Sequence, residues 1–380
     1  MIDVKEISCT GCFSCKSICP LNAISIFVDD KGFCYPKIDN KKCINCGLCK
    51  KVCPCYNLRQ NNTHEIEAYG GVHLNNEMLM SSQSGGAFAG LAESVLKNEG
   101  VAYGAAIVEN LKVKQIRIDR LEDLYKLQGS KYVQSDVDKS FEQCACDLNA
   151  GIIVIYSGTS CMIDGLLNFL KLKKIRTDRL ITVDLICHGV ASPGIFEEHK
   201  KRIEEEYEDK LISLNFRDKK YSGWHSHYET YVFSKGTTVH ENYWAELMYS
   251  HVIMRECCHE CRYVKMEQKL ADITIADFWG VEKCNPEYLD DNRGCSLIIV
   301  RSDKGKKLLT SAPMNIFKAE LNQAVKHNMT KSAIKPKFYN DYWNDYKKNG
   351  FKYSLKKYTI YGGVAFRIKR KILKILKKWE

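Results

Sequence analysis

The sequence predicts an α/β protein, α+β overall, in which a small cysteine-rich N-terminal domain precedes a layered α/β domain and a basic C-terminal helix. Three observations predict this fold class. Two cysteine runs of the same spacing stand 34 residues apart, strand-like and helix-like segments alternate after residue 86, and ten Lys or Arg but one Glu lie between residues 352 and 380. The expected divisions are residues 1–56, a polar linker at 57–67, a large region at 68–340 and a tail at 352–380.

The N-terminal domain is defined by the pattern C-x2-C-x2-C-x3-C-P, which occurs twice. Bacterial ferredoxins hold two [4Fe-4S] clusters with this pattern, because three closely spaced thiolates bind one cluster and the fourth cysteine of each run reaches the other. Zinc sites pair two C-x2-C units instead, which disfavours a zinc or disulfide scaffold. Clusters in series indicate electron transfer. The expected ligands are Cys9, Cys12, Cys15 and Cys53 for cluster one, and Cys43, Cys46, Cys49 and Cys19 for cluster two.

Regular elements are expected in the following order. Residues 23–28 and 34–38 flank a turn at 29–32 and predict a β-hairpin. After the linker, the pattern predicts helices at 87–96, 138–149, 163–172 and 194–207, alternating with strands at 101–108, 151–156 and 180–186. This alternation favours a layered domain with a largely parallel sheet. From 211 to 318 the pattern is less regular, with strand-like runs at 228–233, 272–276 and 296–300.

Composition excludes several classes of protein. Hydrophobic residues make up 45% of the 380 residues, enough for a core, yet the longest aliphatic run, at 152–155, is far shorter than the roughly 20 residues of a membrane span. Nineteen cysteines without a signal peptide predict a reducing, cytoplasmic location. The net charge of +11 is concentrated in the tail, so we do not expect a nucleic-acid partner.

Glycine- and hydroxyl-rich segments are the candidate ligand sites. Ser84, Gly85 and Gly86 open the helix at 87–96, where free N–H groups and the helix dipole would favour a pyrophosphate; simple helix capping is the alternative. Residues 129–135 offer hydroxyls, one cation and an aromatic ring. The segments 156–161 and 183–189 each end a strand, and ligands of open α/β sheets bind outside the carboxyl ends of the strands.

Four further cysteines form a candidate third [4Fe-4S] site, because this is the number of thiolates that such a cluster needs. They are Cys161, Cys187, Cys258 and Cys261. The alternative is that Cys161 and Cys187 are small buried hydrophobic residues, as free cysteines often are. The remaining cysteines are expected mostly to fill the core or the surface; they are Cys34, Cys55, Cys144, Cys146, Cys257, Cys284 and Cys295.

In this order, the segments resemble the coenzyme F-420 hydrogenase/dehydrogenase beta-subunit family over roughly residues 1–310. The resembling motifs lie at 82–88, 129–135, 158–162, 186–193, 257–261 and 272–280. The sequence departs from the family motifs at Gln83, Ser160, Met162 and Cys257. The departures around Cys161 lie close to the expected reaction centre and leave the substrate open.

The resemblance implies FAD, held by the α/β domain and exchanging electrons with the clusters. It implies an iron–sulfur flavoprotein oxidoreductase that transfers hydride to a substrate or coenzyme, with a redox protein or coenzyme as partner and no catalytic residue assigned. The alternatives are an electron-relay subunit whose catalytic partner is another chain, or a structural iron–sulfur module. The implied flavin-binding residues are Ser84, Gly85, Gly86, Ser130, Lys131, Tyr132, Gly158 and Thr159.

The basic tail predicts an amphipathic helix at 365–379. Ile368, Ile372, Ile375 and Trp379 share helical spacing, and cations fill the other face. Such a helix can lie on an anionic bilayer, which would place the protein at the inner face of the membrane. The alternative is that its apolar stripe packs on the protein or on a partner chain.

Overall fold

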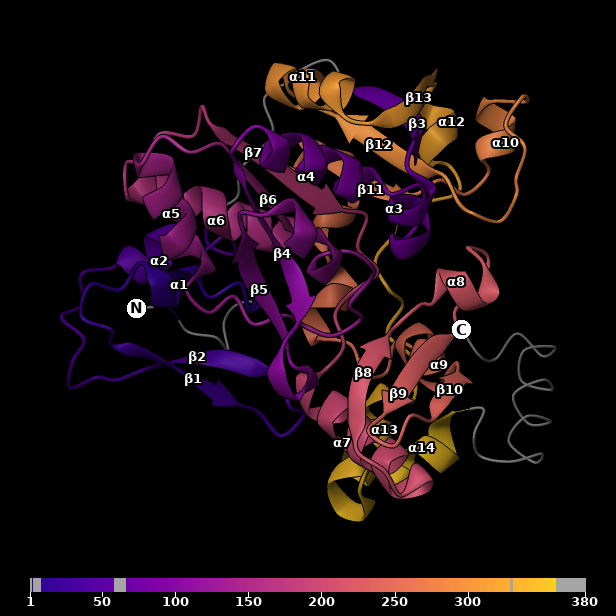
Figure 1. The fold of residues 1–380 in the computed structure, drawn as a ribbon. Helices are drawn as coiled ribbons and strands as arrows, with labels where there is room; N and C mark the ends of the chain where they lie inside the picture. The colour runs from indigo at the N-terminus through magenta and orange to yellow at the C-terminus, as the bar shows by residue number, and fades with distance from the viewer. Residues whose placement is uncertain (1, 3–7, 58–65, 329–330, 360–380) are drawn as a thin grey trace.

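The structure is a computed structural model that describes residues 2, 8–57, 66–328 and 331–359 (Figure 1). The N-terminal domain contains the predicted hairpin, in which β1 (Ile24–Val28) pairs antiparallel with β2 (Cys34–Ile38). The Asp29 carboxylate accepts hydrogen bonds from the backbone N–H groups of Lys31 and Phe33, at 3.1 and 2.8 Å, and closes the turn. Two short helices, α1 (Ser14–Ser17) and α2 (Leu48–Val52), follow the two cysteine loops.

An eight-stranded mixed sheet forms the centre of the protein, and its strand order is β13-β3-β12-β11-β7-β6-β4-β5. The α/β class is confirmed, but the prediction of a largely parallel sheet is wrong. Only β11, β7, β6 and β4 are parallel neighbours, and the outer pairs are antiparallel. β5 is antiparallel because a short connection joins it to β4, whereas a parallel return needs a long crossover. The strands are β3 (Glu67–His73), β4 (Val101–Ile107), β5 (Val113–Ile118), β6 (Val154–Gly158), β7 (Leu180–Leu185), β11 (Ile273–Asp277), β12 (Ser296–Val300) and β13 (Met314–Ala319).

Helices cover both faces of this sheet, as expected for alternating side chains on buried strands. Ile155 of β6 belongs to the core that includes α4 (Ala87–Lys97) and α11 (Asp303–Ser311). Its neighbours Val154 and Tyr156 belong to the core that includes α5 (Ser140–Asn149) and α6 (Ser160–Leu172). That second core continues into the N-terminal domain through Ile18 and Val52. The N-terminal domain is therefore packed on the α6 side of the sheet.

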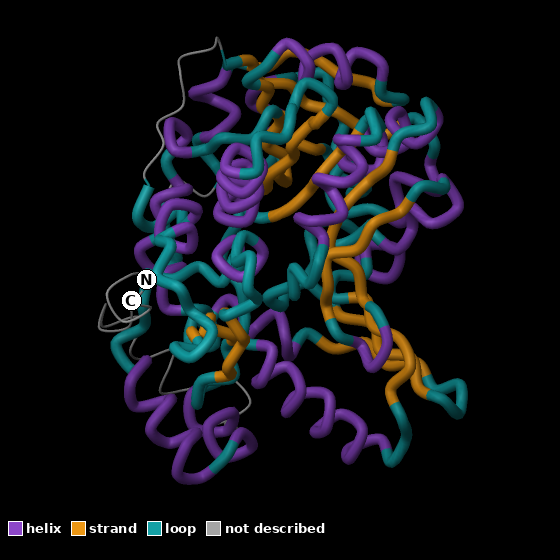
Figure 2. The backbone as a smooth tube through the Cα atoms, turned by 90° about the vertical axis from the view of Figure 1, so that its left-hand side faces the viewer, coloured by secondary structure: helices purple, strands orange, loops and turns teal. Residues whose placement is uncertain are grey.

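A second lobe has its own small sheet, of order β10-β9-β8, and its own core (Figure 2). This lobe contains both helices after residue 338, so the predicted boundary at 340 cuts through a helix. Phe351 and Leu355 are buried in its core, so the start of the predicted tail is part of the folded lobe. Its elements are α7 (Pro193–Tyr207), β8 (Leu211–Asn215), β9 (Glu229–Phe233), β10 (Thr238–Glu241), α9 (Tyr243–Tyr249), α13 (Tyr339–Asn349) and α14 (Phe351–Tyr358).

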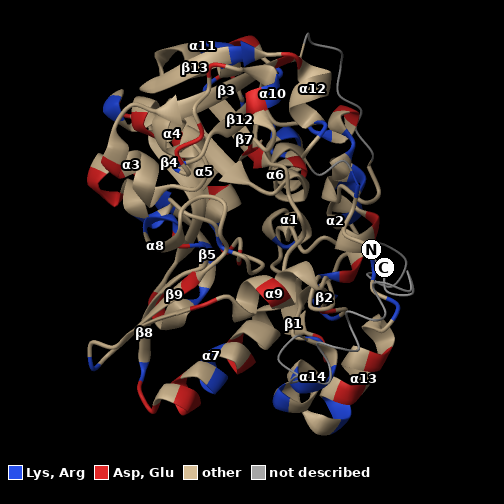
Figure 3. Ribbon diagram, turned by 90° about the vertical axis from the view of Figure 1, so that its right-hand side faces the viewer, with Lys and Arg blue, Asp and Glu red and all other residues tan. Residues whose placement is uncertain are grey.

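The remaining part of the tail, with the amphipathic helix predicted at 365–379, lies outside the described residues, and membrane contact stays a prediction. Among the helices that are described, none combines the length and the apolar character needed to cross a bilayer. Both basic and acidic segments of the ribbon occur along α7 and α13 in Figure 3, which agrees with the balanced charge of the chain outside the tail. The other short helices are α3 (Asn76–Ser81), α8 (Lys219–Ser222), α10 (Val281–Cys284) and α12 (Leu321–Val325).

Glu229, in the core of the second lobe, predicts a pH dependence of stability. Its side chain is fully buried, and burial raises the pKa of its carboxyl group from 4.5 to about 8. The folded protein therefore keeps a proton that the unfolded chain releases near pH 4.5, so the free energy of unfolding falls as the pH rises from about 5 to 8. The loss is up to about 1.4 kcal/mol per unit of raised pKa.

We expect Glu229→Gln to remove this slope and to raise stability at pH 8, because glutamine stays neutral throughout the range. The measurement is the thermal unfolding midpoint between pH 5 and 8. Glu122→Gln is the matched control, because the side chain of Glu122 is 71% exposed. An equal pH slope in the Glu229→Gln variant and the unchanged protein would contradict the assignment.

Candidate iron–sulfur relay and ligand crevice

The two cysteine loops of the N-terminal domain share one backbone conformation. Gly11 and Phe13, on either side of Cys12, have φ values of 72° and 53°. Asn45 and Gly47, on either side of Cys46, have φ values of 55° and 74°. Positive φ on both sides of the central cysteine produces the tight loop that three ligands of one cubane require. The repeat in the sequence is thus also a repeat in three dimensions.

The four predicted ligands of cluster two line a single pocket between the hairpin and α2. They lie among apolar side chains that include Ile24, Ile38 and Leu48. Solvent exposure and the groups around the thiolates are among the factors that set the reduction potential of a cluster. The ligands are Cys19, Cys43, Cys46 and Cys49.

The predicted ligands of cluster one lie on the buried side of the same domain. Burial raises the pKa of the Cys15 thiol, and the neighbouring thiols of Cys12, Cys9 and Cys49 raise it further. Burial likewise raises the pKa of Cys9, to about 11. Thiols of this kind are neutral until they bind metal, and metal binding would release their protons.

The donor sets consist of four thiols for each predicted cluster. In the described part of the chain, no three Cys, His, Asp or Glu side chains converge as the ligands of one metal ion. The thiolates of a [4Fe-4S] cluster each bind a different iron atom, so they do not need to converge on one point. Four thiols are the number that each of the two predicted clusters needs.

The four cysteines of the candidate third site also lie together. Cys161 begins α6, and Cys187 follows the end of the adjacent parallel strand β7. Burial raises the pKa of Cys161, with Cys261 and Cys187 among the thiols that raise it further. Cys258 is held by a hydrogen bond with the Cys257 thiol, which raises the pKa of Cys258, and Cys187 lies near it. Cys257 was expected to be filler, but it lies in contact with this thiol set.

Helix α6 connects the third thiol set with cluster one. Gly165 is one helical turn after Cys161, so the two residues lie on the same face. A Cβ atom at Gly165 would lie 3.0 Å from the Cys12 Sγ atom and even closer to the Ser14 hydroxyl. Glycine at this position is what allows the cluster-one loop to pack directly on α6.

A buried polar network holds the first turn of α6 in place. Asp184, at the end of β7, accepts a hydrogen bond from the Ser160 hydroxyl at 2.5 Å. The Lys269 ammonium lies 3.2 Å from the same carboxylate and 2.7 Å from Ser160 Oγ. Asp184 and Lys269 are 0% and 2% exposed. Their partner Ser160 directly precedes Cys161 in the sequence, and Lys269 also donates to the Leu185 carbonyl at the end of β7, which precedes Cys187.

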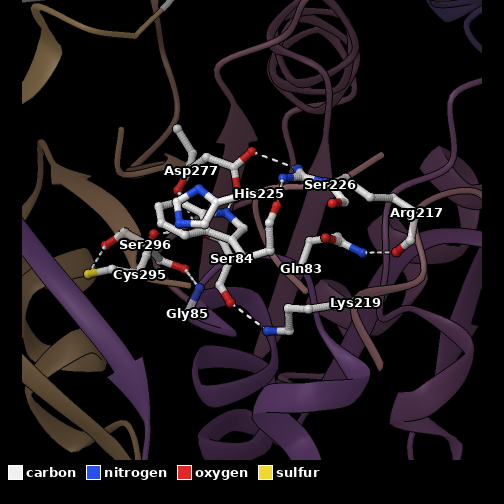
Figure 4. Close-up of polar contacts among 12 residues, drawn as sticks. Gln83, Ser84, Gly85, Arg217, Lys219, His225, Ser226, Asp277, Cys295 and Ser296 are labelled. Carbon is white, nitrogen blue, oxygen red and sulfur yellow. Dashed lines mark hydrogen bonds and ion pairs between the residues drawn. The ribbon is translucent and has the colours of Figure 1, made fainter. Parts of the chain in front are cut away.

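The loop of Ser84, Gly85 and Gly86 is bound within the protein (Figure 4). The Ser296 hydroxyl accepts hydrogen bonds from the N–H groups of Gly85 and Ala87, at 2.9 and 3.3 Å, and the Gly86 N–H is bonded to Gln83 O. The Ser84 hydroxyl donates to the Cys295 carbonyl at 2.5 Å. The prediction that this helix start offers free N–H groups is therefore wrong for residues 85–87. No sequence signal pointed to Ser296, which lies 211 residues away.

The segment with Ser130, Lys131 and Tyr132 is more open. A Cβ at Gly129 would meet no atom within 4 Å. Lys131 Nζ donates to the carbonyl oxygens of Gln128 and Lys126, at 2.6 and 3.2 Å, and burial lowers the pKa of Lys131 to about 7. A cation that is held by carbonyl dipoles and has no described carboxylate partner suits an anionic ligand. The Gln128 amide also donates to Ser82 Oγ at 2.9 Å, so the two predicted ligand loops are neighbours.

The other two flavin candidates lie at the thiol set instead. Thr159 Oγ1 lies 3.2 Å from the Cys161 Sγ atom, and Gly158 packs against the Met162 side chain. Gly158 and Thr159 thus belong to the immediate surroundings of Cys161.

A polar and aromatic cluster of side chains lies at the carboxyl ends of β7 and β11. Arg217, 2% exposed, forms an ion pair with Asp277 at 2.9 Å, and the Trp224 indole N–H donates to the same carboxylate at 2.7 Å. Tyr249 packs edge-on against His188 and His227. His188 directly follows Cys187, so this cluster of side chains begins where the third thiol set ends. Sequence reasoning missed Arg217, His227 and Tyr249, which lie outside the quoted motifs.

Two parts of the chain match known family models. Residues 153–323 match the family model that describes the C terminus of the beta subunit of coenzyme F420 hydrogenase/dehydrogenase. Residues 8–57 match a 4Fe-4S dicluster domain. The resemblance predicted from the sequence is confirmed over these two ranges.

One solved structure that is similar to the chain is titled "Xenon derivatization of the F420-reducing [NiFe] hydrogenase complex from Methanosarcina barkeri". The matched chain has 17% sequence identity and a TM-score of 0.45, and the match covers 79% of this chain and 91% of that one. The comparison with curated proteins found no match.

The motif at 272–280 has a structural role among these side chains. Asp272 accepts hydrogen bonds from the backbone and hydroxyl of Thr182, both at 2.8 Å, and ties β11 to β7. Asp277 holds Arg217, and Trp279 stacks on Trp224 with ring centroids 4.5 Å apart. Ser160, one of the departures from the family motifs, is used to anchor Asp184. The chain thus combines a 4Fe-4S dicluster domain with a region similar to the C terminus of this beta subunit.

Proposed function

We propose that the protein is an iron–sulfur flavoprotein oxidoreductase, in which electrons pass between [4Fe-4S] clusters and FAD, and then by hydride transfer to a substrate or coenzyme. The observation that carries this proposal is an uninterrupted series of thiol sets. It begins at the cluster-two pocket, continues through cluster one and α6, and ends beside the cluster of side chains that contains Arg217, Tyr249 and His188.

Each step in the series rests on a contact. Cys49 of cluster two lies near Cys15 of cluster one. Cys12 of cluster one packs on α6 one turn from Cys161. Cys187 of the third set is followed by His188, whose ring packs on Tyr249. We therefore propose that the third thiol set also binds a [4Fe-4S] cluster.

The flavin would couple one-electron transfer by the clusters to two-electron chemistry on the substrate. The chain's own residues bind and orient it. We propose that Ser130, Lys131 and Tyr132 contact the flavin directly, because the space beside Gly129 is open and Lys131 lacks a described acidic partner. Ser84, Gly85 and Gly86 shape the adjoining wall, and Gly158 and Thr159 line the path from Cys161.

Anaerobic purification of the full chain tests this function. We expect flavin absorbance together with about 12 iron atoms per chain, or about 8 if only the ferredoxin clusters form. Lys131→Met should lower the flavin content and leave the iron content unchanged, whereas the exposed Lys173→Met serves as the matched control. Iron without flavin in the unchanged protein would contradict the proposal.

A second candidate function is an electron-relay subunit, and the surface around cluster two favours it. Leu21 and Ile44 line the cluster-two pocket and are 46% and 66% exposed. Exposed apolar side chains beside a redox centre suit a protein partner. Both functions need a redox partner, and this surface is where we propose that it docks. Because clusters need reduced thiols and all 19 cysteines are free, we propose a cytoplasmic location.

A further inference from the structure

Arg255 is a fully buried cation without a carboxylate partner. Its side chain is 0% exposed, and no described Asp or Glu lies within ion-pair distance of it. Its Nε atom donates to the Cys9 carbonyl at 2.8 Å, and one terminal nitrogen donates to Gln134 Oε1 at 2.9 Å. Both terminal nitrogens donate to the Cys34 carbonyl at 3.2 Å. These hydrogen bonds join the guanidinium to the iron–sulfur domain and to Gln134.

The guanidinium lies between cluster one and the third thiol set. Toward cluster one, it binds the Cys9 carbonyl and covers the Tyr35 ring at 4.1 Å. Toward the third set, it is a hydrogen-bond partner of the Cys257 thiol, and the Cys258 N–H is bonded to the Arg255 carbonyl at 2.9 Å. Among the described residues, Arg255 is the fully buried charged side chain whose contacts reach both thiol sets.

An unpaired buried charge is costly, because desolvation is not repaid by an ion pair. Two other buried arginines illustrate the usual solution: Arg217 pairs with Asp277, and Arg202 pairs with Glu241. Arg255 has no such amino-acid partner among the described residues. Clusters with thiolate ligands carry net negative charge, and nearby charge helps to set their reduction potential. The charge of Arg255 is therefore balanced when the neighbouring thiols hold iron.

We propose that Arg255 is the shared counter-charge of cluster one and the third cluster, and that it raises the reduction potential of both. An added electron makes a cluster more negative, so a fixed cation stabilises the reduced form of each cluster. Arg255 is thus a positioning residue of the electron path. The part that concerns the third cluster rests on the proposed function, whereas the part that concerns cluster one depends only on the dicluster domain.

A structural role alone would also explain the hydrogen bonds of Arg255, so the test must separate charge from packing. Gln134→Glu places a carboxylate against the guanidinium and neutralises it, while the arginine stays in place. Arg255→Gln removes the cation directly. Arg176→Gln is the control for net charge, because the side chain of Arg176 is 87% exposed.

The measurement is an EPR-monitored redox titration of the full chain with its clusters, supported by iron analysis. We expect Gln134→Glu and Arg255→Gln each to disfavour reduction of cluster one at least tenfold, which is a potential about 59 mV more negative for a one-electron couple. Cluster two should shift less, and Arg176→Gln should shift neither cluster.

Unchanged cluster-one potentials in Gln134→Glu, with full iron content, would overturn the proposal. If Arg255→Gln loses iron, Gln134→Glu still decides the question. Failure of the proposed function looks different: the protein would lack flavin, or would contain about 8 iron atoms, while the cluster-one potential could still be measured and compared.

Discussion

Replacing Cys46 by serine should remove cluster two and lower the iron content by about 4 atoms per chain. Cys46 is the central cysteine of its loop and lines the cluster-two pocket with Cys43 and Cys49. A serine hydroxyl does not supply the thiolate that the cluster needs. The measurements are iron and sulfide content and the EPR spectrum of the reduced protein. Because this pocket carries the exposed apolar surface, the variant should also lose electron uptake from a protein donor.

Cys146→Ser is the matched control for this experiment. Cys146 is exposed on α5 and is not among the cysteines that line the cluster-two pocket. We expect this variant to keep its full iron content and its rate of reduction. An unchanged iron content in Cys46→Ser would show that Cys46 is not a cluster ligand. A flavin content that remains equal in both variants would show that the effect is confined to the iron–sulfur domain.

Lys269→Met should destabilise the protein by roughly 3–5 kcal/mol, the usual cost of removing one partner of a buried ion pair. Asp184, at 0% exposure, would keep hydrogen bonds from Ser160 and Thr274 but lose its cation. The first turn of α6 and the end of β7 would loosen together. The measurement is the thermal unfolding midpoint of the anaerobically purified protein, which should fall by several degrees.

The double variant Lys269→Met/Asp184→Asn distinguishes loss of charge balance from loss of packing. It removes both charges, so it should be more stable than Lys269→Met alone. Lys173→Met, at an exposed position after α6, should have no effect. If the double variant is no more stable than the single one, the cost is one of packing and the ion-pair explanation fails.

The parts of the protein that are coded locally could be predicted from the sequence. The cysteine repeat defined the N-terminal domain, because ligand spacing is a property of neighbouring residues. The hairpin and the helices α4 to α7 were also expected, since their apolar periodicity and turn residues lie within each segment. The sequence also predicted that Cys161 and Cys187 lie close together, because each follows the end of a strand. These two strands, β6 and β7, are parallel neighbours.

The parts that depend on long-range contacts could not be predicted. Ser296 occupies the N–H groups of Gly85 and Ala87 through a pairing of distant strands, which no local pattern encodes. The strand β5 was not predicted, because the run from 113 to 118 contains two cations and a glutamine. Buried and less buried residues alternate in only part of this strand. Arg255 stands two residues before Cys257. The sequence therefore shows a charged residue beside candidate ligands, but it does not show that the side chain is buried.

Gly165 has a consequence for the rate of electron transfer. Tunnelling rates fall steeply with the distance between redox centres, so a path that crosses two domains is usually sensitive to their relative motion. Here the cluster-one loop rests on the same rigid helix that carries Cys161, one turn away. In the proposed electron path, the length of this tunnelling step is therefore set by the pitch of an α-helix.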